Sequence, residues 1–147
     1  MLPAADLRVE RHDGLLAVFD PLRGRWVALT PEEWVRQHFT SWLVNGLGYP
    51  ASLTANEVSL KLNRTSRRAD TVVFDHRGNP WMIVEYKRPD VRITREVFEQ
   101  ALRYNIVLKA RFIVVSNGMS HFCCECGDDI EGGMRFLKSV PPYRRRD

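Results

Sequence analysis

The sequence contains little cysteine and no long apolar run. Its three cysteines lie within four positions, at Cys123, Cys124 and Cys126, and an odd number so close together does not form the disulfide framework of a small secreted domain. No run of eighteen apolar residues is present, and the N-terminal stretch lacks the pattern of a signal peptide. We therefore expect a cytoplasmic protein with reduced thiols and no association with a membrane.

A strong excess of one charge, internal repeats and low-complexity segments are also missing. The 22 Lys and Arg residues against 18 Asp and Glu residues give a net charge of +4, which is compatible with an anionic partner but does not establish one. With 147 residues, 44% hydrophobic and 27% charged, the chain has the composition of one globular domain with its own core.

Local patterns divide the chain into a short extension and a main domain. Short segments rich in apolar residues at 15–19 and 25–29, on either side of a turn, predict an N-terminal β-hairpin. We expect the hairpin extension over residues 1–29, the main domain over 30–140 and a basic tail over 141–147.

The main domain is expected to combine helices with a mixed sheet. Thr30 as N-cap and Pro31 at the first helical position predict a helix that ends near residues 46–48. The other predicted elements are strands at 56–62, 70–75, 81–87, 112–116, 119–124 and 134–137, a second helix at about 95–107 with Thr94 as its N-cap, and a basic link at 63–68. Because the second helix connects strand 81–87 to strand 112–116, these two strands should be parallel.

Two acids and a lysine fall together on adjacent predicted strands. Side chains alternate along a strand, so Glu85 and Lys87 project from the same face, and the turn at 76–80 brings Asp70 to their level. Mg²⁺ prefers hard oxygen ligands, and Asp70, Glu85 and the carbonyl of Tyr86 would supply them. Lys87 would orient an attacking water and counter charge in the transition state. The alternative is an ordinary surface ion pair between Glu85 and Lys87.

The second predicted helix adds two polar residues. Gln100 and Tyr104 are four positions apart and therefore lie on one helical face, where an amide and a phenol suit contacts with a phosphate backbone. The alternative is a solvated helix face.

Together these residues resemble the PD-(D/E)XK nuclease superfamily, whose fold is restriction-endonuclease-like. Segments 30–37, 67–70 and 84–89 look more closely like the N-terminal nuclease domain of type I restriction enzyme R subunits. The resemblance covers residues 26–140. It implies a mixed β-sheet flanked by helices and Mg²⁺-dependent cleavage of DNA, with Mn²⁺ as a substitute.

The resemblance also assigns roles to single residues. It implies Asp70, Glu85 and Lys87 as the central triad, with Gln100 and Tyr104 as an accessory motif. A glutamate on the first helix, usually four residues before an arginine, also belongs to the pattern. Glu32 has this spacing to Arg36 and should face the sheet, so we favour Glu32, with Glu33 as the close alternative.

The chain departs from R subunits in one important respect. It contains no glycine-rich Walker loop and so lacks the ATP-driven motor that follows the nuclease in those proteins. We therefore expect either a nuclease that acts on DNA alone or as a homodimer, or a subunit that depends on a partner for recognition or motor function. The alternative from another class is a nucleic-acid-binding or assembly module with the same fold that does not cleave.

Two further groups of residues bear on binding. His121 and the three cysteines offer zinc ligands, but adjacent strand residues point to opposite faces, so buried strand cysteines are the better interpretation. Basic residues gather in sequence around the site and would contact phosphates; these are Lys61, Arg64, Arg67, Arg68, Lys87, Arg88, Arg92, Arg95 and Arg103.

Overall fold

The computed structural model describes residues 2–62 and 64–144, except for the side chains of Leu62, Tyr104, Ile106 and Val107. The strands are β1 (Val9–His12), β2 (Leu15–Asp20), β3 (Arg25–Ala28), β4 (Thr54–Leu62), β5 (Thr65–Phe74), β6 (Pro80–Tyr86), β7 (Phe112–Ser116), β8 (His121–Cys126) and β9 (Met134–Leu137). The helices are α1 (Pro31–Ser41), which continues as a π-helical turn over Trp42–Gly46, α2 (Arg95–Leu108), and two short 3₁₀ turns at Ala51–Leu53 and Glu131–Gly133.

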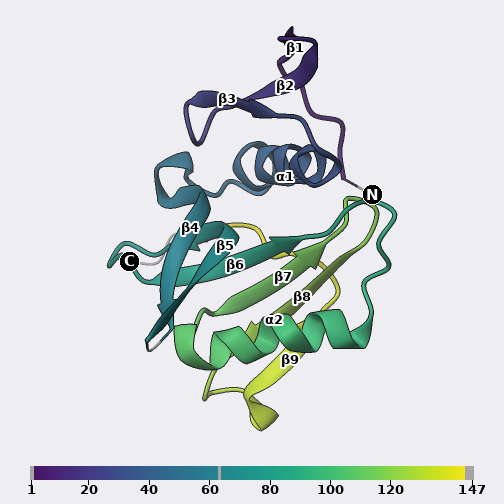
Figure 1. Cartoon of the computed structure of the whole chain (residues 1–147). Helices are drawn as coiled ribbons and strands as arrows, with labels where there is room; N and C mark the ends of the chain where they lie inside the picture. The colour runs from purple at the N-terminus through teal and green to yellow at the C-terminus, as the bar shows by residue number, and fades with distance from the viewer. Residues whose placement is uncertain (1, 63, 145–147) are drawn as a thin grey trace.

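The strands form two sheets that are separated by α1. The large sheet has the order β4-β5-β6-β7-β8-β9, and β1, β2 and β3 form a small antiparallel sheet. Figure 1 shows α1 between the small sheet and the large sheet, with α2 on the opposite face of the large sheet. This confirms the expected α/β fold, a mixed sheet flanked by helices with an N-terminal hairpin, to which β1 adds a third strand.

The two faces of the large sheet carry separate apolar cores. Side chains from α1 and the following turn pack on one face, with Val35, Phe39 and Leu43 fully buried. Phe98 and Ala101 of α2 pack on the other face against Ile113 of β7. This alternation is the period-two pattern expected of a sheet that is covered on both sides.

Both helices begin where their capping residues predict. The hydroxyl of Thr30 accepts a hydrogen bond from the Glu33 amide at 3.1 Å, and the hydroxyl of Thr94 accepts one from the Val97 amide at 3.3 Å. In the described part of the chain, neither helix is long and apolar enough to cross a membrane.

The centre of the large sheet also agrees with the prediction. Strands β6 and β7 are parallel, with Met82 opposite Phe112 and Tyr86 opposite Ser116. Every residue of β7 is buried, as befits a strand with neighbours on both edges and helices on both faces.

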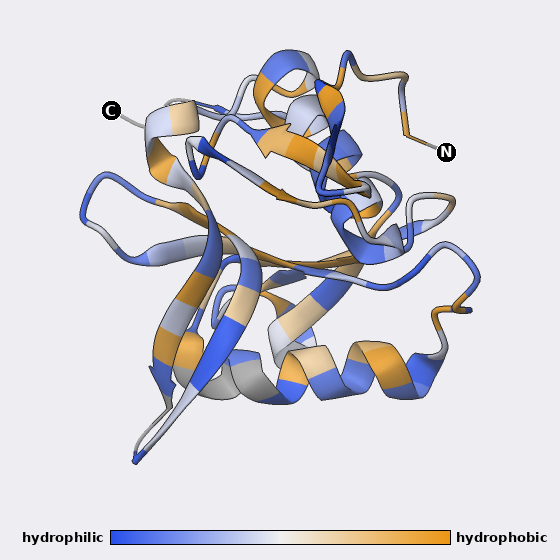
Figure 2. Ribbon diagram, turned by 45° about the horizontal axis from the view of Figure 1, so that its top comes forward, coloured by the Kyte–Doolittle hydropathy of each residue, from blue (hydrophilic) through white to orange (hydrophobic). Residues whose placement is uncertain are grey.

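The expected basic link at 63–68 is wrong. β5 begins at Thr65, and β4 and β5 stay paired as far as Leu62 and Thr65, so the described basic residues belong to a long hairpin. The hairpin runs away from the rest of the sheet (Figure 2). Polar and basic side chains are tolerated there because Lys61, Arg64 and Arg68 are exposed.

The left-handed end of α2 gives a stability prediction. Lys109 is exposed with φ of 57°, and its amide donates to the carbonyl of Asn105 at 2.8 Å. Because glycine adopts this conformation without the steric cost of a Cβ, Lys109→Gly should raise the free energy of unfolding by about 1 kcal/mol in urea denaturation.

Lys138→Gly is the matched control, because Lys138 is also exposed but has no positive φ. It should leave stability unchanged or lower it slightly. Equal losses in the two variants would show that the left-handed backbone at Lys109 carries no cost.

Candidate active site

The site forms where the large sheet divides. The pairing of β5 with β6 reaches Thr71 opposite Val84 and goes no further, whereas β5 remains paired with β4 back to Thr65. At the point of separation the amide of Tyr86 donates to Oδ2 of Asp70 at 2.8 Å. The carboxylate of Asp70 is thereby fixed between the two diverging strands.

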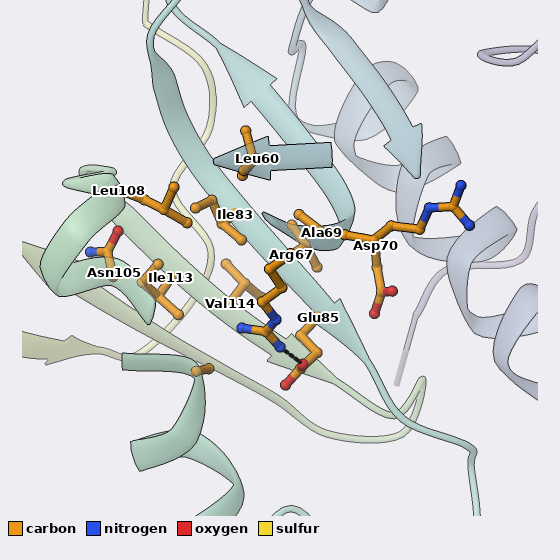
Figure 3. A pocket seen from close by; sticks show the side chains of 13 residues that line it. Leu60, Arg67, Ala69, Asp70, Ile83, Glu85, Asn105, Leu108, Ile113 and Val114 are labelled. Carbon is orange, nitrogen blue, oxygen red and sulfur yellow. Dashed lines mark hydrogen bonds and ion pairs between the residues drawn. The ribbon is translucent and has the colours of Figure 1, made fainter. Parts of the chain in front are cut away.

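A cavity lies in this fork, with acidic side chains towards one end and side chains of α2 towards the other. Figure 3 shows Asp70 and Glu85 towards one end of it, and Asn105 and Leu108 of α2 at the other. The complete lining is Leu60, Arg67, Arg68, Ala69 and Asp70 from the hairpin, Ile83, Val84 and Glu85 from β6, Ala101, Asn105 and Leu108 from α2, and Ile113 and Val114 from β7. The hairpin, the sheet and α2 therefore all contribute to one hollow.

Glu85 is held by two cations. Nη2 of Arg67 lies 2.5 Å from Oε1 of Glu85, and Nζ of Lys87 lies 4.0 Å from Oε2. The structure thus places Lys87 and Glu85 on one face, as expected from their spacing. The Arg67 contact, which crosses the fork from the hairpin to β6, is visible in Figure 3.

The surroundings of Asp70 disfavour its charged form. Burial is the main cause that raises the pKa of Asp70 above its usual value, and the nearby carboxylates of Glu85 and Glu57 act in the same direction. The Tyr86 amide and the charge of Arg36 oppose this rise in pKa without cancelling it. A carboxylate with this imbalance is expected to bind a cation favourably.

Arg36 joins α1 to the strand that carries Asp70. Its guanidinium is buried, and Nη1 donates to the Asp70 carbonyl at 3.0 Å while Nη2 donates to Oε1 of Glu57 at 2.5 Å. Its Nε lies 3.4 Å from Oε2 of Glu33 and makes no hydrogen bond. Arg36 therefore supports the backbone of Asp70 and bridges two acidic side chains.

The expected orientation of Glu32 is wrong. Glu32 is exposed, whereas Glu33 is buried and pairs with Arg23 Nη2 at 2.7 Å and with Gln37 Nε2 at 2.9 Å. Besides the large sheet, the small sheet covers α1 on a second side (Figure 1), so a residue of α1 that does not face the large sheet can still be buried. The side of α1 that bears Glu33 is the one that meets the turn after β2.

Of the predicted accessory pair, Gln100 and Tyr104, only Gln100 has a described side chain. Gln100 is exposed and does not line the cavity, because α2 turns Phe98, Ala101 and Asn105 towards the sheet. The side chain of Tyr104 lies outside the described residues.

The three cysteines do not all converge, because Cys124 and Cys126 lie at the core on the α2 face and Cys123 lies on the other face of the sheet. Cys123 packs in the core on the α1 face and Cys124 in the core on the α2 face, and burial raises the pKa of each thiol to about 12. Across the residues that the structure describes, no group of three or more His, Cys, Asp or Glu side chains could hold a metal ion.

Two residues near Asp70 were not singled out from the sequence. In the sequence, Arg36 served only to identify Glu32 by its spacing. Its charge between the apolar positions Val35 and Phe39 could have indicated a functional side chain. Glu57 lies on β4 beside the Asp70 backbone with a left-handed φ of 57°. No sequence pattern indicates that conformation for a glutamate within a strand.

Comparisons with known proteins bear on the family and the fold. The family described as type I restriction enzyme R protein N terminus (HSDR_N) matches residues 31–141. No curated protein matches the chain. Among solved structures, the chain is similar to a DUF820 protein from Anabaena variabilis ATCC 29413 that has been proposed to be a nuclease, with a TM-score of 0.50 and 12% identity over 91% of this chain and 85% of that one.

At 12% identity the structural similarity shows the fold alone, and this fold is the restriction-endonuclease-like one expected from the sequence. The family match spans α1, the hairpin and the strands that carry Asp70, Glu85 and Lys87. The chain therefore belongs to the family of the type I restriction enzyme R protein N terminus and is a nuclease-like domain related to those R subunits.

Proposed function

We infer that this chain is a metal-dependent endonuclease that hydrolyses phosphodiester bonds of DNA. The observation that carries the proposal is the convergence of Asp70, Glu85 and Lys87 at the fork between β5 and β6, beside a cavity. Two acids and an ammonium in such a position suit phosphodiester hydrolysis, and the family supplies the substrate class.

The donor set fits Mg²⁺, with Mn²⁺ as a substitute. Mg²⁺ is commonly held by one or two carboxylates and keeps its other positions for water and substrate phosphate oxygens. Asp70 and Glu85 would provide the carboxylates and the Tyr86 carbonyl a further oxygen. Within the described part of the chain no third acid is grouped with them as a metal ligand, and Mg²⁺ sites of this open kind do not require one. When bound, the ion would polarise the scissile phosphate and favour deprotonation of water.

The protein's own cations have separate tasks. Lys87 lies within 4.0 Å of Glu85, so its ammonium would orient the attacking water and stabilise negative charge that develops on the phosphate. The exposed Lys61, Arg64 and Arg68 of the hairpin would bind DNA phosphates. Gln100 is better placed for a contact with DNA outside the cavity than for a role within it.

A non-cleaving nucleic-acid-binding or assembly module is the second candidate. It is favoured by the Arg67 guanidinium on Glu85, because a cation that already occupies a carboxylate competes with a metal ion for it. In this reading, as in that of a nuclease that depends on a partner subunit, the isolated chain binds DNA without turnover.

Lys87 provides the most direct test of the proposed hydrolysis. Lys87→Ala should lower the rate of plasmid nicking about 100-fold or more, because a charge that stabilises the transition state is lost. Supercoiled plasmid is incubated with each protein in Mg²⁺, in Mn²⁺ and in EDTA, with Lys138→Ala as a control at an exposed site.

Metal-dependent cleavage by the wild type and by Lys138→Ala, but not by Lys87→Ala, is the expected result. Equal cleavage by all three would contradict the role of Lys87. Salt-sensitive DNA binding without cleavage by the wild type would favour the second candidate.

Adjacent glutamates on α1 provide a matched pair. Glu33→Gln should lower the free energy of unfolding by about 2–3 kcal/mol and reduce cleavage, because it leaves the buried Arg36 and the half-buried Arg23 with less compensation of their charges. Glu32→Gln should change stability by less than about 0.5 kcal/mol, because Glu32 is exposed. Urea denaturation and plasmid nicking test both, and a larger effect of the Glu32 substitution would restore the original assignment.

The raised pKa of Asp70 predicts a conflict between stability and activity. The folded state binds the proton of Asp70 more tightly than the unfolded state, so ionised Asp70 costs stability at neutral pH. Asp70→Asn should therefore abolish cleavage but raise the free energy of unfolding at pH 7. The difference from the wild type should shrink as the pH falls through the folded pKa towards the unfolded value of 3.8. A difference that is constant with pH would show that burial of charge is not its cause.

A further inference from the structure

We propose that the small N-terminal sheet is a working part of the active site, and that Asp20 is the residue through which it positions Asp70. Asp20 ends β2 and lies outside residues 31–141, which match the family. The inference deepens the proposed function and rests on it. The structure connects Asp20 to both sides of Asp70 by two separate chains of contacts, one of hydrogen bonds and ion pairs and one of hydrogen bonds alone.

Asp20 is a saturated, fully buried carboxylate. Its exposed fraction is 0%, Oδ1 accepts the Leu22 amide at 2.8 Å, and Oδ2 accepts Asn56 Nδ2 at 3.0 Å together with Nε of Arg23. Burial alone would raise the pKa of Asp20, but these hydrogen bonds outweigh it and hold the pKa below its usual value. Burying a charge on a peripheral sheet is costly in free energy unless hydrogen-bond and ion-pair partners compensate it.

The first chain runs through α1 to the backbone of Asp70. Arg23 Nη2 donates to Glu33 at 2.7 Å, Glu33 pairs with Arg36, and Arg36 donates to the Asp70 carbonyl at 3.0 Å. The charges alternate in sign from Asp20 to Arg36, so each group is compensated by its neighbours. Neutralising Asp20 would disturb Arg23 first and then the contacts of Arg36.

The second chain runs through the large sheet to the residue that orients the Asp70 carboxylate. Asn56, held by Asp20, accepts a hydrogen bond from the Thr71 hydroxyl at 2.6 Å, and the Tyr86 hydroxyl donates to the same Thr71 oxygen at 2.8 Å. Tyr86 is also the residue whose amide donates to Oδ2 of Asp70. Both chains therefore end at the groups that fix Asp70.

Backbone strain marks the same place independently. Glu57 follows Asn56, has a left-handed φ of 57°, and falls between the pairs Asn56–Thr71 and Val58–Ala69, level with Asp70. Such a conformation in a non-glycine strand residue persists only where the surroundings determine it. Here the Asp20 contact holds Asn56 on one side, and the Arg36 contact holds the Glu57 side chain. The two chains thus meet around the one strained residue beside Asp70.

The test compares Asp20→Asn with Glu10→Gln in the full chain. Glu10 is an exposed acid on β1 of the same small sheet, where it pairs with His12, so it controls for a change of charge on that sheet. Three quantities are measured in the wild type and both variants: amide hydrogen exchange by NMR, Mn²⁺ affinity by calorimetry, and kcat and KM for plasmid nicking.

In Asp20→Asn we expect exchange of the Tyr86 amide to accelerate about tenfold relative to the Val114 amide in the core of β7. Mn²⁺ affinity should fall about 10–100-fold, as is typical when a residue that supports a metal ligand is lost. kcat should fall with little change in KM. Glu10→Gln should match the wild type in all three measurements.

Equal acceleration at Tyr86 and Val114 would show general destabilisation and would overturn the proposal, as would unchanged Mn²⁺ affinity in a folded variant. If Asp20→Asn does not fold, Arg23→Gln breaks the first chain alone and is judged by the same measurements. Absence of cleavage by the wild type would contradict the proposed hydrolysis by the chain on its own, whereas amide exchange and Mn²⁺ binding would still decide the role of Asp20.

Discussion

The arrangement depends on the hydrogen bond from the Tyr86 amide to the carboxylate of Asp70. At this position β6 bonds to a side chain of β5 and the pairing of the two strands stops, so β5 continues with β4 as a separate hairpin. One bond therefore orients Asp70, opens the fork and creates the cavity into which Glu85 projects. Neighbouring strands lie less than 5 Å apart while they are paired, so an unbroken ladder would leave no space there.

Such a site is not built for stability. Arg36 and Glu33 are buried, and Asp70 keeps a raised pKa, although buried ion pairs often contribute little net stability after desolvation. An apolar set of residues would hold α1 against the sheet equally well. The buried charges of Arg36 and Glu33 are better explained by the need to hold the Asp70 carboxylate rigidly in a position where a cation would stabilise its charged form.

The sequence predicted those parts of the site that depend on local rules. Alternation along β6 put Glu85 and Lys87 on one face, and the caps Thr30 and Thr94 marked the starts of both helices. The prediction failed where contacts with distant elements determine which side chain is buried or which backbone conformation is adopted. Glu33 is buried because the small sheet covers a further side of α1, and the left-handed backbone of Glu57 follows from side-chain contacts to distant elements. Neither effect has a signature within a window of neighbouring residues.

If the site binds a metal ion and DNA as proposed, the charge balance at the fork would link the two binding events. Glu85 is compensated by Arg67, which belongs to the hairpin, so a cation that binds Glu85 must weaken that contact. A DNA phosphate offers Arg67 a replacement partner of the same charge as the carboxylate it leaves. Binding of either ligand would therefore lower the free-energy cost of breaking the Arg67–Glu85 contact for the other. By linkage, each ligand would raise the affinity for the other by the same factor. In the proposed nuclease, the ion pair between Arg67 and Glu85 would therefore be the element through which the site responds to DNA.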